Sequence, residues 1–275
     1  MNRVGSLALV DAKRSIKYAP FYVAEARIRN MRKWKLSIIL GTLSNPIFMM
    51  LSVGIGVGSF INSRSAGHGM DGVPYMTFLA PALLATVCLQ DAMAETTFPV
   101  LQGFKWERTF FSMNATPIGP NDIAMGTFYA AILRTIFSSI IYYFVMMMFG
   151  VVHGVRPMFS MITAVLGGMA FAALMLGATA AIENDDFFLA LVGRFLIMPV
   201  FLFSGTFYPL TSMPKFLQLL GWLSPLWHAT ELGRWLSYGH HISTTAILLH
   251  LAYMVVMTYF GLSFARNRFR WRLSK

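Results

Sequence analysis

Six long apolar runs, separated by short segments rich in polar residues, set the pattern of this sequence. They cover residues 36–61, 75–98, 123–152, 158–182, 187–208 and 245–265. A helix needs roughly 20 apolar residues to cross the hydrocarbon layer of a bilayer, and each run has at least that length. The pattern therefore predicts an all-α membrane protein with six transmembrane helices.

The composition is that of a membrane protein. Of the 275 residues, 56% are hydrophobic and only 12% are charged, whereas about 25% of the residues in a soluble domain are charged. The net charge of +11 comes mainly from the two chain ends, so anionic lipid headgroups are a better counter-charge than nucleic acid. The single cysteine, Cys88, excludes an intrachain disulfide.

The distribution of Lys and Arg predicts the orientation. Nine such residues precede residue 36 and five follow residue 265. Because cytoplasmic segments carry an excess of Lys and Arg, both termini are expected in the cytoplasm. Lys105 and Arg108, between the second and third runs, fall on the same side. The segments predicted to lie outside contain only four Lys or Arg residues, namely Arg64, Arg156, Lys215 and Arg234.

This layout divides the chain into a basic leader at residues 1–35, a membrane domain at residues 36–265 and a basic tail at residues 266–275. In the leader, one helical face carries apolar residues and the rest is basic. The apolar positions are Phe21, Ala24, Ile28 and Met31, and the basic ones are Arg27, Arg29, Arg32 and Lys33. The spacing predicts an amphipathic helix in the cytoplasmic membrane interface. The alternative is a disordered basic tail.

Two connecting segments carry more apolar residues than a linker needs. Residues 99–122 mix aromatic with charged side chains, which predicts a helix of about ten residues followed by a turn at residues 117–120. Its aromatic residues fit either a docking surface for a cytoplasmic partner or a place among lipid headgroups. Residues 209–244 contain an apolar helix that is too short to span and is interrupted by prolines, which predicts re-entrant or interfacial helices on the outer side.

The sequence contains no recognisable catalytic site. It has no Gly-x-x-x-x-Gly-Lys-Ser/Thr loop for nucleotide phosphates and no serine in a Gly-x-Ser-x-Gly setting. Its six histidines lack the spacing of metal ligands. Gly54, Gly56 and Gly58 lie within the first apolar run, where they indicate close helix packing. Neither an enzyme active site nor a metal site is expected.

Four ionisable residues lie within the apolar runs: Asp91 and Glu95 in the second, Arg134 in the third and Arg194 in the fifth. Such groups are costly in a membrane unless they are paired or hydrated, so they are expected to face the bundle interior. Counting residues from the cytoplasmic ends predicts that Asp91 pairs with Arg194, while Arg134 lies deeper. Two interpretations remain open: a polar lining of a substrate path, or ion pairs that fix helix register.

Three stretches of sequence resemble the permease subunits of ABC-2 type exporters, in particular the subgroup of NodJ nodulation-factor permeases and daunorubicin-type drug-export permeases. The first is Asn-Pro-Ile-Phe at residues 45–48, followed by the glycine run. The second is Phe-Leu-Ala-Pro at residues 78–81, with residues 95–98, 107–110 and 115–118. The third is Phe-Ser-Gly-Thr-Phe-Tyr-Pro-Leu at residues 203–210, continuing through residues 223–228 to Glu231. Together they cover nearly the whole chain in order.

The resemblance implies a half-transporter permease that exports hydrophobic or amphipathic cargo, such as a drug or a lipid-linked saccharide, across the bacterial inner membrane. It implies a second permease copy, identical or homologous, and a dimer of separate ABC ATPase subunits that bind ATP and Mg. No cofactor is expected in this chain. The residues that match the family's coupling helix are Phe104, Trp106, Glu107, Arg108 and Phe110, with Asp185 and Asp186 as a second ATPase contact. The outer re-entrant segment contains Gly205, Pro209, Pro225 and Glu231.

Two other functions compete with this expectation. The first is a proton-coupled secondary transporter in which Asp91 and Glu95 form a proton relay. The second is a membrane scaffold without transport activity. Transport that survives loss of the ATPase and collapses with the proton gradient would favour the secondary transporter.

Overall fold

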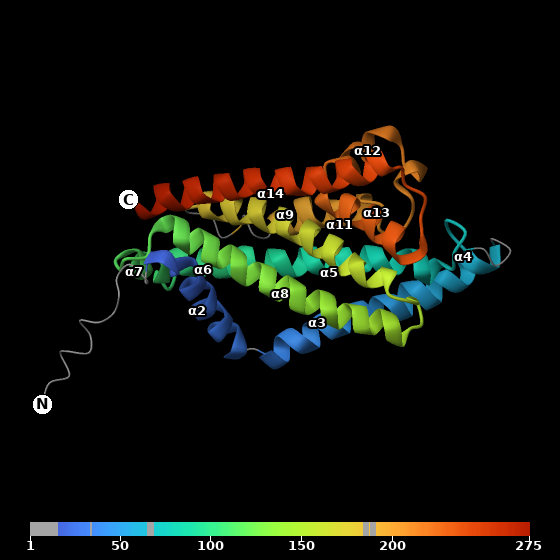
Figure 1. Ribbon diagram of the computed structural model, residues 1–275, viewed down its shortest axis with the longest axis horizontal. Helices are drawn as coiled ribbons and strands as arrows, with labels where there is room; N and C mark the ends of the chain where they lie inside the picture. Colours follow the sequence, from blue (N-terminus) through green and yellow to red (C-terminus); the bar gives the residue numbers. More distant parts are fainter. Residues whose placement is uncertain (1–15, 34, 65–68, 184–186, 188–190) are drawn as a thin grey trace, which may run out of the picture.

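The computed structural model describes residues 16–33, 35–64, 69–183, 187 and 191–275, and within these ranges the chain forms helices and connecting loops. The long helices run side by side along the longest axis of the molecule (Figure 1). In the described ranges, β-structure is limited to one isolated bridge between Met70 and Val73. The predicted all-α class is confirmed.

The described elements, in chain order, are α2 (Ala19–Lys33), α3 (Lys35–Met49), the π-helix η1 (Met50–Val57), α4 (Gly58–Arg64), α5 (Tyr75–Thr96), α6 (Phe98–Phe104), α7 (Thr109–Asn114), α8 (Pro120–Met148), the 3₁₀-helix η2 (Arg156–Phe159), α9 (Ser160–Ala181), the π-helix η3 (Val192–Ile197), α11 (Met198–Phe203), the 3₁₀-helix η4 (Leu210–Ser212), α12 (Lys215–Trp222), α13 (Pro225–Tyr238) and α14 (Thr244–Leu273).

Within the described ranges, five continuous helical units are long and apolar enough to cross a membrane: Lys35–Arg64, Tyr75–Phe104, Pro120–Met148, Arg156–Ala181 and Thr244–Leu273. They correspond to the first four predicted runs and the sixth. The fifth run overlaps residues that lie outside the description, and its described apolar helix, Val192–Phe203, is shorter than a span. The sixth transmembrane helix therefore stays a prediction.

Helix α5 forms the centre of the bundle. It is apolar on nearly all sides and is buried along most of its length against α8, α9 and α13. Helices α9 and α14 also pack along each other, and they approach closely at Gly177 and Gly261. A Cβ atom at Gly177 would clash with Phe264, and one at Gly261 would clash with Ala173. Small residues thus allow the close helix contact that packing in a membrane favours.

The glycine run of the first span serves packing at two of its three positions. Gly54 and Gly58 are buried, and a Cβ at these positions would lie 3.2 Å from Met76 and 3.4 Å from Tyr75 at the start of α5. Gly56 is exposed. The packing prediction is therefore confirmed for Gly54 and Gly58, whereas Gly56 has no close neighbour from another helix among the described residues.

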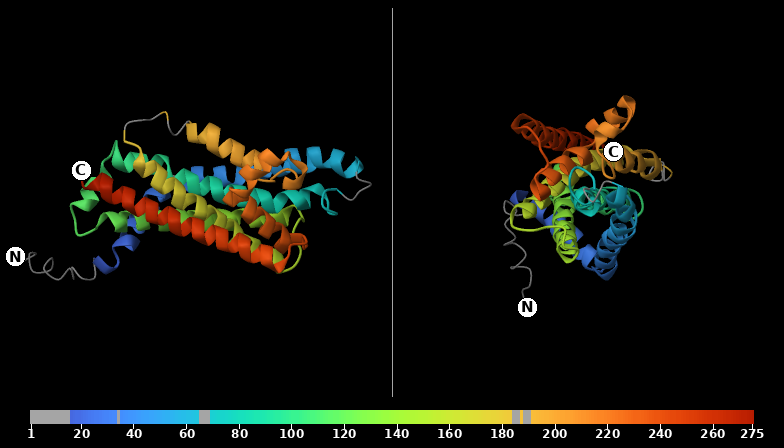
Figure 2. Two further views of the ribbon diagram at one scale, coloured as in Figure 1. Left: turned by 90° about the horizontal axis from the view of Figure 1, so that it is seen from above. Right: turned by 90° about the vertical axis from the view of Figure 1, so that its right-hand side faces the viewer.

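The bundle has two distinct ends. Helices α2, α6 and α7 and the last turns of α14 lie together at the basic end, and α4, α12 and α13 lie towards the opposite, far end (Figures 1 and 2). From the distribution of Lys and Arg, the basic end is the one predicted to face the cytoplasm.

The leader contains the predicted helix, α2, in a rotation that buries its small residues and leaves Phe21, on the predicted membrane-facing side, open. Ala19, Val23 and Ala24 are buried, whereas Phe21 is 59% exposed. The packing on α8 decides this rotation, because a Cβ at Gly126 would lie only 2.5 Å from both Val23 and the carbonyl oxygen of Pro20. The notch at Gly126 seats α2 on α8 and turns Arg27, predicted on the basic face, towards α5.

The segment before the last span forms two short helices, as the sequence predicts. Helix α12 has an exposed apolar face, and α13 packs inside the bundle against α5 and α9. Ser224 begins α13, because its side chain accepts a hydrogen bond from the amide of Leu226, and Pro225 occupies the first helical position. Gly239, with φ of 81°, ends the helix in the left-handed conformation.

Candidate functional site

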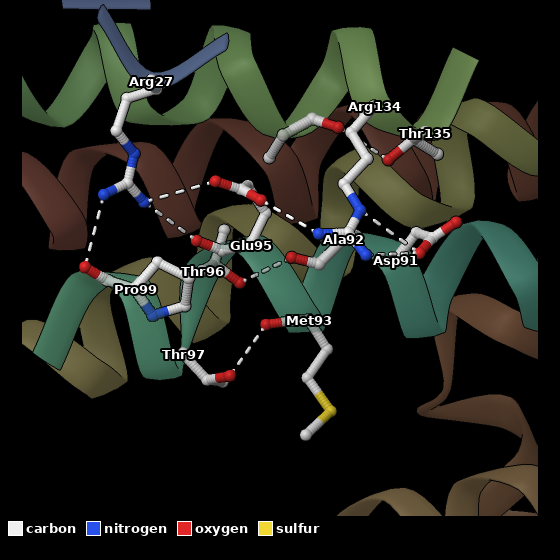
Figure 3. Close-up of polar contacts among 11 residues, drawn as sticks. Arg27, Asp91, Ala92, Met93, Glu95, Thr96, Thr97, Pro99, Arg134 and Thr135 are labelled. Carbon is white, nitrogen blue, oxygen red and sulfur yellow. Dashed lines mark hydrogen bonds and ion pairs between the residues drawn. The ribbon is translucent and has the colours of Figure 1, made fainter. Parts of the chain in front are cut away.

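An ion-pair network joins α5 to α8 near the basic end. Asp91 and Glu95 are four residues apart, so they lie one turn apart on the same face of α5. Arg134 of α8 reaches both carboxylates: its Nη2 lies 3.0 Å from Asp91 Oδ1, and its Nη1 lies 3.1 Å from Glu95 Oε2. A second bond runs from Arg134 Nε to Asp91 Oδ1 at 3.3 Å. Figure 3 shows this guanidinium between the two carboxylates.

Arg27 extends the network to α2. Pro99 has no amide hydrogen, so it cannot donate the helical bond to the carbonyl of Glu95, four residues earlier. Arg27 supplies the missing donor at 3.2 Å, and it also donates to the carbonyl of Pro99 at 3.2 Å. Its Nη2 lies 3.4 Å from the carboxylate of Glu95. Burial lowers the pKa of Arg27, and the charge of Glu95 opposes that shift.

The observed pairing corrects the sequence analysis. Asp91 pairs with Arg134, and Arg194 is exposed on the π-helix η3. The error has a geometric cause, since counting depth from the span ends ignores helix rotation. The spacing of Asp91 and Glu95 contained the better signal, because two carboxylates one turn apart can share one guanidinium. The two arginines and two carboxylates of the network sum to zero charge.

A turn at residues 105–108, called the exposed turn here, projects from the basic end between α6 and α7. Its base is aromatic and buried: the rings of Phe104 and Phe110 lie 4.9 Å apart, and Phe269 of α14 contacts Phe104 at 4.9 Å and Phe110 at 5.6 Å. Gly103 lets the Phe110 ring approach, because a Cβ there would lie 2.7 Å from it. The predicted single helix of about ten residues is therefore two short helices folded onto each other.

The tip of the exposed turn presents its side chains outward. Trp106 is 47% exposed, and its ring lies 5.1 Å from that of Phe98. Glu107 accepts a hydrogen bond of 2.6 Å from Gln102. Arg108 has φ of 52°, a left-handed conformation that is uncommon for a residue other than glycine, and its guanidinium lies 5.1 Å from the Phe111 ring. The turn is thus held in one shape from both sides.

The five described residues of the predicted coupling segment divide into two groups. Phe104 and Phe110 are buried and support the turn, whereas Trp106, Glu107 and Arg108 are exposed at its tip. The predicted second contact, Asp185 and Asp186, lies outside the described residues.

Arg272 of α14, which the sequence pattern did not single out, stabilises the base of the exposed turn. Its guanidinium lies 4.2 Å from the centre of the Phe104 ring, and it donates to the carbonyls of Thr179 and Ala180 at 3.4 and 3.2 Å. Those carbonyls end α9, where a cation is favoured.

At the far end, Arg234 of α13 is a second residue that the sequence analysis missed. Only 1% of it is exposed. It pairs with Glu231 at 2.9 Å, donates to the carbonyl of Gly205 at 2.7 Å, and lies 3.7 Å from the centre of the Phe78 ring. Gly205, with φ of 70°, turns that carbonyl towards the arginine. The i, i+3 spacing of Glu231 and Arg234 was the signal available in the sequence.

The prolines of the predicted outer segment mark element boundaries. Pro209 immediately precedes η4 and Pro225 begins α13. Both positions suit a residue without an amide hydrogen, because the first turn of a helix leaves its N–H groups unbonded.

Glu231 also joins a cluster that closes the far end. His240 lies between two carboxylates, with Nδ1 against Asp71 and Nε2 3.3 Å from Glu231. Tyr238 donates a 2.8 Å hydrogen bond to Asp71. The hydrogen bond to Glu231 raises the pKa of His240 against the opposing effect of burial, and the charges of Glu231 and Asp71 raise it further. The cluster ties the loop before α5 to the link between α13 and α14.

Comparison with known proteins matches a domain that contains the ion-pair network and the exposed turn. The model of the ABC-2 type transporter family matches residues 21–238. Nodulation protein J of Sinorhizobium fredii is 30% identical over 209 residues, which are 75% of this chain and 77% of that protein. Nodulation protein J of Rhizobium leguminosarum bv. viciae is 27% identical over 83% of this chain and 86% of its own. The inner membrane transport permease YadH of Escherichia coli is 29% identical over 72% of this chain and 74% of its own.

Proposed function

Because the chain belongs to the ABC-2 type transporter family, we propose that it is the membrane permease subunit of an exporter whose ATP hydrolysis takes place in a separate ATPase subunit. The ATPase binds ATP and Mg, and the permease provides the path for hydrophobic or amphipathic cargo. The basic end faces the cytoplasm, in line with its Lys and Arg content. The inner membrane is the site of action, in keeping with the name of the relative from Escherichia coli.

The observation that carries this proposal is the form of the exposed turn. An exposed aromatic and two exposed charges stand on a buried aromatic base at the end of the bundle. Aromatic and arginine side chains dominate the energetics of protein interfaces, and a preformed tip loses little entropy on binding. The base includes Phe269 of α14, so a force applied to the tip is passed to a helix that extends to the far end.

The contacts of the intramembrane carboxylates argue against a proton relay. A relay needs a carboxylate that binds and releases protons during transport. Asp91 and Glu95 are instead both engaged by Arg134, and Glu95 is also engaged by Arg27. We therefore place the energy source outside this chain.

A second permease copy completes the path in this proposal. Asn45 of α3 and Gln90 of α5 form an exposed hydrogen bond at 3.1 Å on the face between α3 and α11. Exposed amides are unfavourable against lipid chains, because hydrocarbon offers no hydrogen-bond partners. Cover by a second copy, or by water held between two copies, removes that cost.

The coupling role is tested by purifying the chain together with its ATPase and measuring complex formation and ATP hydrolysis. Trp106→Ala is expected to weaken assembly at least about tenfold, as for an aromatic hot spot. Arg108→Gly removes the side chain while keeping the left-handed backbone, which glycine adopts freely, so its effect reports the lost guanidinium rather than strain.

Matched controls come from the far end of the same chain. Phe159→Ala removes an aromatic that is 53% exposed, and Arg64→Ala removes an exposed arginine. Both are expected to leave assembly and hydrolysis unchanged. Assembly and hydrolysis of the Trp106 and Arg108 variants at the level of these controls would refute the docking role of the turn.

A further inference from the structure

Two histidines from different helices meet at the far end, away from the ion-pair network. His228 lies near the start of α13, and His250 lies in the second turn of α14. Their Nδ1 atoms are 2.7 Å apart, and the two residues are only 8% and 7% exposed. A buried contact between two titratable rings therefore joins the outer segment to the last span.

The same pair holds the end of α12. A helix leaves its last carbonyls without partners inside the helix, and α12 ends at Trp222. Nε2 of His228 lies 2.9 Å from the carbonyl oxygen of Trp222, and the hydroxyl of Tyr253 donates to the carbonyl of Leu223 at 2.5 Å. The rings of His228 and Tyr253 are stacked, with their centres 3.9 Å apart. Helices α12, α13 and α14 therefore meet at the two imidazole rings.

The partners of the two rings determine where their protons lie. A carbonyl oxygen only accepts hydrogen bonds, so Nε2 of His228 carries a hydrogen, and Nδ1 of the neutral ring is an acceptor. Nδ1 of His250 must then carry the hydrogen that closes the contact. One additional proton can be accommodated, because Nδ1 of His228 becomes the donor, Nδ1 of His250 accepts, and the hydrogen of His250 moves to its Nε2. The contact therefore survives with one positive charge.

A second additional proton cannot be accommodated. Both Nδ1 atoms would then carry a hydrogen and neither could accept, and two positive charges would face each other at 2.7 Å. Burial lowers the pKa of His228 to about 4, against the opposing effect of its bond to the Trp222 carbonyl. Once the helices separate and the rings are hydrated, each ring binds its own proton below about pH 6.5. Acid therefore favours the separated state.

The charged neighbours leave a doubly protonated pair without a free counter-charge among the described residues. Glu231, on the next turn of α13, acts on both rings, but Arg234 and His240 already engage its carboxylate. Helix α9, which packs against both α13 and α14, has no titratable side chain. The remaining titratable groups on the elements around the pair are Tyr253 of α14, Tyr238 of α13 with its partner Asp71, Tyr75 at the start of α5, Lys215 of α12 and Arg156 of η2, together with groups of α5 and α14 nearer the basic end.

We propose that His228 and His250 form a proton-sensitive clasp that keeps α12 and α13 on α14, and that binding of a second proton to the pair opens it. The far end is predicted to lie outside the cytoplasm, so the clasp responds to acidification of the outer compartment and loosens the outer helices there. The clasp is a property of this chain alone, and it stands or falls independently of the ATPase and of the cargo.

The test is hydrogen–deuterium exchange of the full-length chain in lipid nanodiscs between pH 7.5 and pH 4.5. His250→Asn is the decisive variant, because asparagine keeps an N–H donor in the place of Nδ1 but cannot be protonated. The ratio of α13 exchange in the native chain to that in His250→Asn is expected to be near one at pH 7.5 and to rise by up to about tenfold for each pH unit below 6.5, the effect of one proton. Comparison at the same pH cancels the intrinsic exchange rate and the titration of Glu231 and His240.

A second variant and an internal control complete the design. His250→Leu removes the donor, so α13 is expected to exchange roughly fivefold faster than in the native chain at pH 7.5. The first half of α8, at the basic end, is expected to exchange equally in all three chains. Equal exchange of α13 in the native chain and His250→Asn at every pH would overturn the proposal. So would native α13 exchange that, corrected for the intrinsic rate, accelerates no more than that of α8 in acid, and this second outcome needs no variant to fold.

Discussion

Replacing Arg134 with methionine is expected to destabilise the chain by about 3–5 kcal/mol, the usual cost of removing one partner from a buried ion pair. The network holds two guanidinium groups and two carboxylates, so the change leaves one negative charge uncompensated. Solvent can do little to relieve it, because the side chains of Asp91 and Glu95 are only 12% and 5% exposed. At about 2–4 °C per kcal/mol for a chain of this size, the unfolding midpoint should fall by about 6–20 °C.

The chain carries its own reporter for this measurement. Cys88 is the only cysteine, and it is completely buried in α5. A dye that becomes fluorescent on reaction with a thiol therefore reads out the opening of the bundle as purified protein is heated in detergent. The same assay checks the folding of the variants of the exposed turn.

Two further variants separate charge balance from lost packing. Arg29→Met removes an arginine whose pair with Glu25 is exposed at both side chains, 73% and 53%, and it should move the midpoint by no more than about 1–2 °C. Arg134→Met combined with Asp91→Asn restores neutrality and leaves the pair between Arg27 and Glu95 in place, so it should recover more than half of the loss. The reasoning is wrong if Arg134→Met behaves like Arg29→Met, or if the double variant is no more stable than the single one.

Three other predictions use the same assay. Arg234→Lys should lower the midpoint by at least about 4 °C, because lysine cannot reproduce the arginine fork that binds both Glu231 and the carbonyl of Gly205; an unchanged midpoint would contradict the role of Arg234. For His240, the raised pKa means that the stabilising charge is fully present below the unfolded value of 6.5 and is lost as pH rises through the folded pKa. The advantage of the native chain over His240→Asn should therefore shrink as the pH rises above about 6.5, and an advantage that grows would have the wrong sign. Gly126→Ala should push α2 off α8 at a cost of about 1–3 kcal/mol, seen as faster trypsin cleavage after Arg29 than in an Ala124→Gly control, which adds no atoms; equal cleavage rates would refute the notch.

The spans were predictable from sequence because their signal is local. Apolar runs of the right length identify five helical units without knowledge of any neighbour. The same holds for the two short helices before the last span, where Pro214, Pro225 and Gly239 mark the boundaries. The fold of the exposed turn was not predictable in the same way. Phe104 and Phe110 are buried by Phe269, more than 150 residues later, and nothing in the local pattern of residues 99–122 shows which aromatics meet that partner.

The contacts within the candidate site could not be predicted for a related reason. Whether a charged side chain is buried depends on the rotation of its helix about the helix axis. Counting residues from the end of a span gives only the depth of that side chain in the membrane. Arg27 was predicted on the basic face of the leader helix, yet the notch at Gly126 turns it inward to the carbonyl that Pro99 leaves free. That carbonyl was visible in the sequence, since every proline within a helix leaves the fourth residue before it without a bond. Asking where each such carbonyl finds a donor would have found Arg27.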